Sequence, residues 1–261
     1  MAGEDVTYPP LDVLKPVAEN LWIVDSGPQD AMGLDLPVRM TVIRLGNGDV
    51  WLHSPTRFSA ELRREIETLG PIRHLVAPNI AHWTHLKGWQ GSCPAAKTSA
   101  APKLRERAQV RKEGLRLDRD LTDIPPAEWN GEIEQVVVPG GAGFREVAFF
   151  HRPTRTLILT DLVQNLEPEK LSFGTRLFAK LTGVQAPNGK APAYLRLVVR
   201  LRLKEAREAL ARIVAWNPER VIFSHGRWFE RDGATRLKRS FAWLLGRPRD
   251  SAELTSSPKR T

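Results

Sequence analysis

Two histidines stand three positions apart in the segment "NIAHWTHLKGW" at residues 79–89. They are His82 and His85, and their rings point the same way if a helical turn begins at this motif. Imidazole nitrogens are good ligands for zinc, but zinc sites use three or four protein ligands. The motif therefore predicts a metal site only if the rest of the chain supplies further ligands.

Other candidate ligands stand at the ends of predicted strands. His53 ends "VWLH", Asp161 ends "TLILTD" and His225 ends "VIFSH", while His82 and His85 follow the strand "HLVAP". Loops at one edge of a sheet often carry active-site ligands, because the sheet is rigid and the loops approach from several directions. Several imidazoles and one carboxylate in such loops form a ligand set that zinc prefers.

Each of these residues also has a structural explanation that the sequence leaves open. Asp161 could cap the segment that follows it. The two imidazoles of the motif could bond to backbone while Trp83 and Trp89 pack inward, and the Ser-Pro pair after His53 could fix that residue in a loop.

The elements that must position these residues follow from hydrophobic periodicity and turn residues. Strands are expected at 21–25, 38–45, 50–56, 72–78, 133–140, 145–151, 156–163 and 220–226, with a hairpin turn at 46–49. Helices are expected at 59–70, 99–109, 168–182, 192–215 and 234–245. Strands covered by helices at intervals predict a layered α/β fold.

The bulk composition is that of an ordinary globular protein. The chain has 261 residues, of which 41% are apolar and 26% charged. It has no apolar run near the roughly 18 residues of a membrane span, and its polar first residues do not read as a secretory signal. The single Cys93 excludes an internal disulfide and a Cys-rich zinc site. We therefore expect a cytoplasmic protein.

The net charge of +9 is concentrated in one part of the chain. Residues 170–220 hold eleven Lys and Arg but three acids, and the segment 168–182 has Phe173, Leu177, Phe178 and Leu181 on one side. The simplest explanation is a solvated helix pair packed on the sheet. Alternatives are a lid for an anionic or amphiphilic substrate and a weak association with a membrane surface. Without a nucleic-acid-binding motif, we expect no nucleic-acid partner.

Four segments resemble, in order and setting, the metallo-β-lactamase-like hydrolases: "WLHSP", "APNIAHWTHLKGW", "TRTLILTDLV" and "VIFSHG". The resemblance covers roughly residues 15–245 and is closest to a branch described as a domain of unknown function. It implies a four-layer αββα sandwich in a single domain at 1–246, with the basic helices at about 168–215 as an insertion. Residues 247–261 are expected to be a flexible polar tail.

The match to the family's metal motifs is partial. His82 and His85 match the second and last histidines of its His-x-His-x-Asp-His loop, Asp161 matches its bridging aspartate, and His225 matches its terminal histidine. The departures are Ile80 for the first histidine, Thr84 for the loop aspartate, a Gly-rich stretch 139–144 without histidine, and His53 in place of an acidic residue. A two-metal site is therefore not expected.

What the resemblance implies is one divalent ion. The favoured ligands are His85, His225 and Asp161, with His82 or His53 completing the set and Asp161 central to catalysis. Zinc is the first choice of ion, iron and manganese are alternatives, and a metal-free protein stays open. The remaining assignments are Thr84 beside the ligands, and Trp83 and Trp89 in the pocket.

The function that follows is a metal-dependent hydrolase acting on an anionic small molecule. An alternative from another class is a ligand-binding protein without catalysis, on a hydrolase scaffold that has lost metal ligands. Fold analogy cannot choose between the two, because one scaffold hosts many activities.

Overall fold

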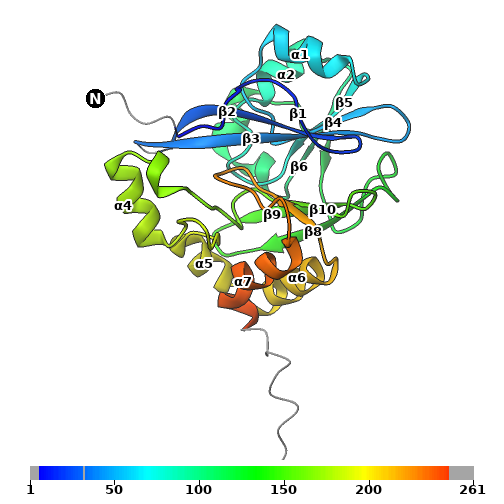
Figure 1. Cartoon of the computed structure of the whole chain (residues 1–261). Helices are drawn as coiled ribbons and strands as arrows, with labels where there is room; N and C mark the ends of the chain where they lie inside the picture. Colours follow the sequence, from blue (N-terminus) through cyan, green and yellow to red (C-terminus); the bar gives the residue numbers. More distant parts are fainter. Residues whose placement is uncertain (1–5, 32, 247–261) are drawn as a thin grey trace, which may run out of the picture.

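Two β-sheets face each other, and helices cover the outer side of each, as Figure 1 shows. The computed structural model describes residues 6–31 and 33–246. The four-layer αββα sandwich predicted from the sequence is confirmed. The segment 247–261, expected to be a polar tail, lies outside the described residues.

The first sheet has seven strands, which lie in the order of the chain. The pairs from β1 to β4 are antiparallel and those from β4 to β7 are parallel. Strand β4 is buried along its whole length, which explains its continuous apolar sequence. The strands are β1 (Lys15–Ala18), β2 (Leu21–Ala31), β3 (Leu34–Arg44), β4 (Val50–His53), β5 (Ile72–Ala77), β6 (Lys97–Ala100) and β7 (Arg119–Asp120).

The second sheet has four strands in the order β11-β10-β9-β8. They are β8 (Ile133–Pro139), β9 (Arg145–His151), β10 (Thr156–Ile158) and β11 (Arg220–Ile222). The core between the two sheets contains Trp51 of β4 and Phe149 of β9, whose ring centroids lie 5.1 Å apart, edge to face. Each fully buried side chain of this kind stabilises the fold by about 2–3 kcal/mol.

The helices form the two outer layers. Helices α1 (Ala60–Glu67), α2 (Leu86–Ser92) and α3 (Ala108–Glu113) bury apolar side chains against the first sheet. Helices α5 (Ala193–Arg200), α6 (Leu203–Ala215) and α7 (Gly233–Leu245) cover the second sheet. Helix α4 (Phe173–Thr182) lies beside the β2–β3 hairpin (Figure 1), and two 3-10 turns, η1 (Leu104–Glu106) and η2 (Pro168–Lys170), complete the list. Within the described residues, no helix has the length and apolar character needed to span a membrane.

Three of the expected helices differ from the structure. The helix expected at 168–182 begins at Phe173, after the 3-10 turn η2. The helix expected at 99–109 is wrong at its start, because Ser99 and Ala100 pair with β5 as the end of β6. The helix expected at 192–215 is divided at Leu201 and Arg202. At this point the carbonyl of Val198 accepts the backbone N–H of Gly141 at 2.8 Å. The N–H groups of Leu201 and Arg202 bond to the carbonyls three residues before them instead of four, which ends α5 in a tighter turn.

His53 lies in the inter-sheet core and gives the fold a testable dependence on pH. Its ring stacks on Trp51 and contacts Phe149, and neither ring nitrogen has a hydrogen-bond partner among the described residues. Burial, and then the charge of His82, lower its pKa to about 3. The unfolded chain takes up this proton near pH 6.5, so stability that is present above pH 6.5 is lost as the pH falls toward 3.

The difference in the free energy of unfolding between a His53→Leu variant and the wild type is therefore expected to be independent of pH above pH 7 and to shift in favour of the variant at lower pH. The shift should reach up to about 4 kcal/mol near pH 3. Urea unfolding at several pH values measures it, and His53→Asn serves as a control that is polar but does not titrate. A constant difference between His53→Leu and wild type would contradict this account.

Candidate metal centre

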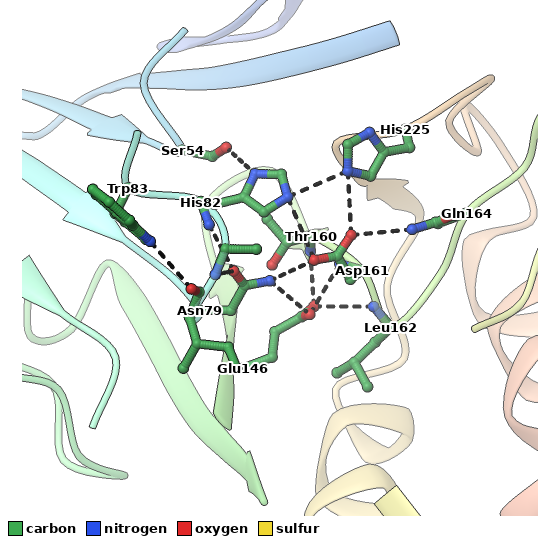
Figure 2. Close-up of polar contacts among 12 residues, drawn as sticks. Ser54, Asn79, His82, Trp83, Glu146, Thr160, Asp161, Leu162, Gln164 and His225 are labelled. Atoms are coloured by element: carbon green, nitrogen blue, oxygen red, sulfur yellow. Dashed lines mark hydrogen bonds and ion pairs between the residues drawn. The ribbon is translucent and has the colours of Figure 1, made fainter. Parts of the chain in front are cut away.

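Three loops at one edge of the two sheets bring His82, Asp161 and His225 together (Figure 2). His82 follows β5, Asp161 follows β10 and His225 follows β11. The Nε2 atoms of the two histidines lie 3.3 Å apart. His82 Nε2 lies 3.4 Å from Asp161 Oδ2, and His225 Nε2 lies 3.2 Å from Asp161 Oδ1. The three side chains are largely buried, with 8% to 16% of their surface exposed.

These separations fit a shared divalent ion. A tetrahedral zinc ion with bonds of about 2.0–2.1 Å holds neighbouring ligand atoms about 3.3 Å apart. The donor set of two imidazole nitrogens and one carboxylate is one that zinc, iron and manganese accept. Among the described residues, this is the one group of His, Cys, Asp and Glu side chains close enough to hold an ion. The structure thus offers one metal position.

Asn79, which sequence reasoning missed, connects two of the three ligands. Its Oδ1 accepts the backbone N–H groups of Ala81 and His82 at 2.8 and 2.9 Å, which fixes the loop after β5. Its Nδ2 donates to Asp161 Oδ2 at 2.7 Å. The same amide therefore turns His82 inward and orients the carboxylate that faces it, as Figure 2 shows.

Glu146, also missed, supports Asp161 from below. This fully buried carboxylate on β9 accepts the backbone N–H groups of Thr160, Asp161 and Leu162 at 2.8, 2.9 and 3.3 Å. Burial, and then the negative charge of Asp161, raise the pKa of Glu146 to about 7, while the three N–H groups oppose the increase. The loop that carries Asp161 is thus folded around a buried acid. A lone carboxylate inside the apolar run "REVAFF" was the sequence signal for it.

His225 is held by strand β3. Its Nδ1 donates to the Pro37 carbonyl at 2.8 Å, so Nε2 is the nitrogen that faces Asp161 and His82. Arg39 donates to the carbonyls of Phe223 and Gly226, both at 2.8 Å, and thereby fastens the loop on either side of His225. A metal-ligating histidine usually has such a backbone partner on its second nitrogen.

The second nitrogen of His82 faces a serine. Ser54 Oγ lies 2.7 Å from His82 Nδ1, and Ser54 has φ +53°, in the left-handed region that a serine rarely adopts. Its backbone N–H bonds to the Val76 carbonyl at 2.9 Å, which ties this conformation to β5. The strained residue therefore aims a hydroxyl at the ring and leaves Nε2 free to face Asp161.

The electrostatics of the centre favour a charged pair when no ion is bound. Burial alone would raise the pKa of Asp161. The charges and hydrogen bonds of His82 and His225 oppose this effect and hold the pKa well below its usual range. Burial would lower the pKa of His225, but the hydrogen bond and charge of Asp161 raise it above its usual value. A cation, whether a proton or a metal ion, is thus stabilised between these side chains.

A cavity of about 180 Å³ opens over the three residues. Its wall includes Thr84, His85, Gln164 and Tyr194 in addition to the three ligands. Gln164 donates to Asp161 Oδ1 at 3.1 Å. The cavity is large enough for the reacting group of a small molecule but not for a whole large substrate.

The cluster differs from the ligand set that the sequence favoured, because His82 stands where His85 was expected. The ring of His85 turns toward β2, where its Nε2 lies 3.3 Å from Gln29 Oε1. His85 begins α2 as its N-cap residue, whereas the loop bonded to Asn79 directs His82 inward. His85 and Thr84 line the cavity without joining the cluster.

The two tryptophans were expected in the pocket, and the structure places them elsewhere. Trp89 is fully buried under α2, with its Nε1 donating to the Thr56 carbonyl at 2.8 Å. Trp83 packs against the same core and donates to the Ile80 carbonyl at 3.2 Å. His53, expected beside the ligands, stacks in the inter-sheet core. Aromatic rings contribute most to stability where they bury their large apolar surface, which explains why these side chains pack in or against the core and not at the cavity wall.

Comparisons with known proteins identify a family and a fold. Residues 18–173 match the family model described as a domain of unknown function (DUF4336). No curated protein is significantly similar in sequence. A metallo-β-lactamase from Pontibacter korlensis is similar in structure, with a TM-score of 0.58 and 15% identity over 90% of this chain and 99% of that one. The metallo-β-lactamase FIM-1 from Pseudomonas aeruginosa in its mono-zinc form gives 0.57 and 15% over 93% and 96%. One from Hirschia baltica gives 0.56 and 15% over 90% and 98%.

Proposed function

Because the chain belongs to the DUF4336 family and has the metallo-β-lactamase fold, we propose that it is a hydrolase that uses one divalent metal ion. The observation that carries the proposal is the approach of three ligand atoms from His82, Asp161 and His225 to within 4.8 Å of one another. We propose zinc as the ion, and the mono-zinc form of one structural relative is consistent with a single position. We place this activity in the cytoplasm, which the single Cys93 supports.

Two residues of the cavity wall would supply the proton chemistry. When bound, the ion supplies Lewis-acid chemistry that lets water act as a nucleophile near neutral pH. Burial, followed by the charges of Arg57 and His82, lowers the pKa of His85, so its ring is neutral at pH 7 and can accept a proton from that water. Gln29, on β2, holds this ring at the wall of the cavity.

Tyr194, on α5, is the proposed hydrogen-bond donor to the substrate. Tyr194 is about half exposed, and its partial burial, followed by the charge of Asp161, raises its pKa to about 12, so the hydroxyl keeps its proton at neutral pH. It can then donate a hydrogen bond to the substrate oxygen on which charge develops. We propose an anionic substrate for two reasons. The positive charge of Arg57 is close enough to lower the pKa of His85 in the cavity wall, and residues 170–204, which include Tyr194, contain no Asp or Glu.

Zinc added to chelator-treated protein is expected to restore hydrolysis of an anionic ester, such as a para-nitrophenyl phosphodiester. Tyr194→Phe should lower kcat about 100-fold while the zinc content stays the same, because it removes the donor and no ligand. Tyr8→Phe changes the only other tyrosine and should leave kcat unaltered. The measurements are kcat and the zinc content per chain for the wild type and both variants. A wild-type chain that does not bind added zinc would instead support the ligand-binding alternative.

A further inference from the structure

Exposed apolar side chains gather on one part of the molecule. In the described part of the chain, every large hydrophobic residue that is exposed, except Ile124, lies on α4, on α5, in the short connection to α6 or at the start of α6. These residues are Phe173, Leu177, Leu181, Tyr194, Leu197, Leu201 and Leu203. We call them the apolar face. Scattered single residues of this kind are ordinary, but a gathered set marks an interaction surface.

The spacing shows that each helix has two apolar sides. Phe173 and Leu181 of α4 are 83% and 74% exposed, while Ala179 of the same helix is buried beside the β2–β3 hairpin. On α5, Leu197 is 64% exposed while Val199 is buried over the second sheet. Each helix thus packs on the rest of the fold through one side, while apolar residues on its second side stay exposed.

The positive charge around the apolar face favours a negatively charged partner. Residues 170–204 contain eight Lys and Arg and no Asp or Glu. Lys180 on α4 and Lys204 on α6 are exposed beside the apolar residues. A second copy of the chain would oppose this charge with the same charge, which disfavours self-association through this face. An anionic lipid surface attracts the lysines and accepts the apolar side chains among its acyl chains.

We propose that the apolar face docks onto an anionic membrane surface. Tyr194 belongs both to this face and to the wall of the cavity over the candidate metal centre. Docking therefore places the cavity at the lipid surface, where amphiphilic anions collect. The choice of an amphiphilic anion as substrate rests on the proposed hydrolase, whereas docking itself does not.

Vesicle binding by the full chain tests the proposal. The wild type is expected to sediment with vesicles of phosphatidylcholine and phosphatidylglycerol, and far less with phosphatidylcholine alone. The double variant Lys180→Gln/Lys204→Gln should lower the partition coefficient on the order of 30-fold. Its control, Lys87→Gln/Lys112→Gln, removes the same charge from α2 and α3, in the helical layer over the first sheet, and should bind as the wild type does.

The apolar contribution is tested by Phe173→Ser/Leu181→Ser/Leu197→Ser, which should lower binding at least tenfold. Ile124→Ser, at an exposed hydrophobic residue outside the face, should not. Asp161→Asn should bind vesicles like the wild type, which separates docking from the metal centre. Three results would overturn the proposal: no binding of wild type to anionic vesicles, equal losses in the control variants, or a wild-type dimer that ignores vesicles and that the serine variant dissociates.

Discussion

Asp161→Asn is expected to weaken zinc binding more than about 100-fold. Loss of residues that only orient a ligand typically costs 10- to 100-fold in metal affinity, so loss of a charged ligand should cost more. Asn has the size of Asp and can still accept the hydrogen bond from Asn79, so the loop should keep its shape. His225→Ala should have an effect of the same size. A competitive zinc titration with a chromophoric chelator measures each affinity.

The control for this prediction is His85→Ala. His85 lines the same cavity but lies outside the cluster, so its loss should change zinc affinity less than about tenfold. If His85→Ala weakened zinc binding as strongly as His225→Ala, the ion would lie where the sequence alone placed it. The geometry around His82 would then have to change on binding.

Glu146→Ala is expected to lower the free energy of unfolding by about 3 kcal/mol or more, since each buried donor left without a partner costs about 1–3 kcal/mol. The variant removes the acceptor of three backbone N–H groups in the loop that carries Asp161. Because burial and the charge of Asp161 raise the pKa of Glu146 to about 7, ionisation of this acid costs stability at neutral pH, and the variant relieves that cost. Three buried N–H groups left without an acceptor are expected to outweigh that relief, so the variant is destabilised. Urea unfolding at neutral pH measures the change.

Glu132→Ala is the matched control, because Glu132 also accepts a backbone N–H, from Gly46, but at an exposed site. Water replaces that acceptor, so the loss there should stay below about 1 kcal/mol. If Glu146→Ala lowered the free energy of unfolding no more than Glu132→Ala does, the loop that carries Asp161 would keep its conformation without the buried acid. In that case zinc affinity would also be unchanged in the variant.

The placement of the candidate ligands at one edge of the sheets follows from the sequence, but the choice among them does not. Apolar runs that end in His or Asp predict residues at strand ends, and His82, Asp161 and His225 do meet there. Which histidine of the loop turns inward depends on Asn79, whose amide bonds to the loop and to Asp161 at once. That bond joins residues 82 positions apart, so no local pattern predicts it.

His53 and the tryptophans illustrate a second limit. His53 and His225 each end an apolar run in the sequence, but only His53 belongs to a strand in the structure. Because β4 is covered on both faces, its last residue packs between aromatic rings. Trp83 and Trp89 stand beside the candidate histidines in the sequence, yet Trp89 lies in the core under α2 and Trp83 packs against that core. Position relative to a strand end is visible in a sequence, whereas the direction of a side chain depends on what covers the strand.

Metal loading of the unaltered chain tests the central claim most directly. Protein stripped with chelator, reloaded with excess zinc and desalted should retain one ion per chain, and zinc X-ray absorption should detect two imidazole ligands. Retention of no zinc, or of two ions per chain, would contradict a single centre shared by His82, Asp161 and His225.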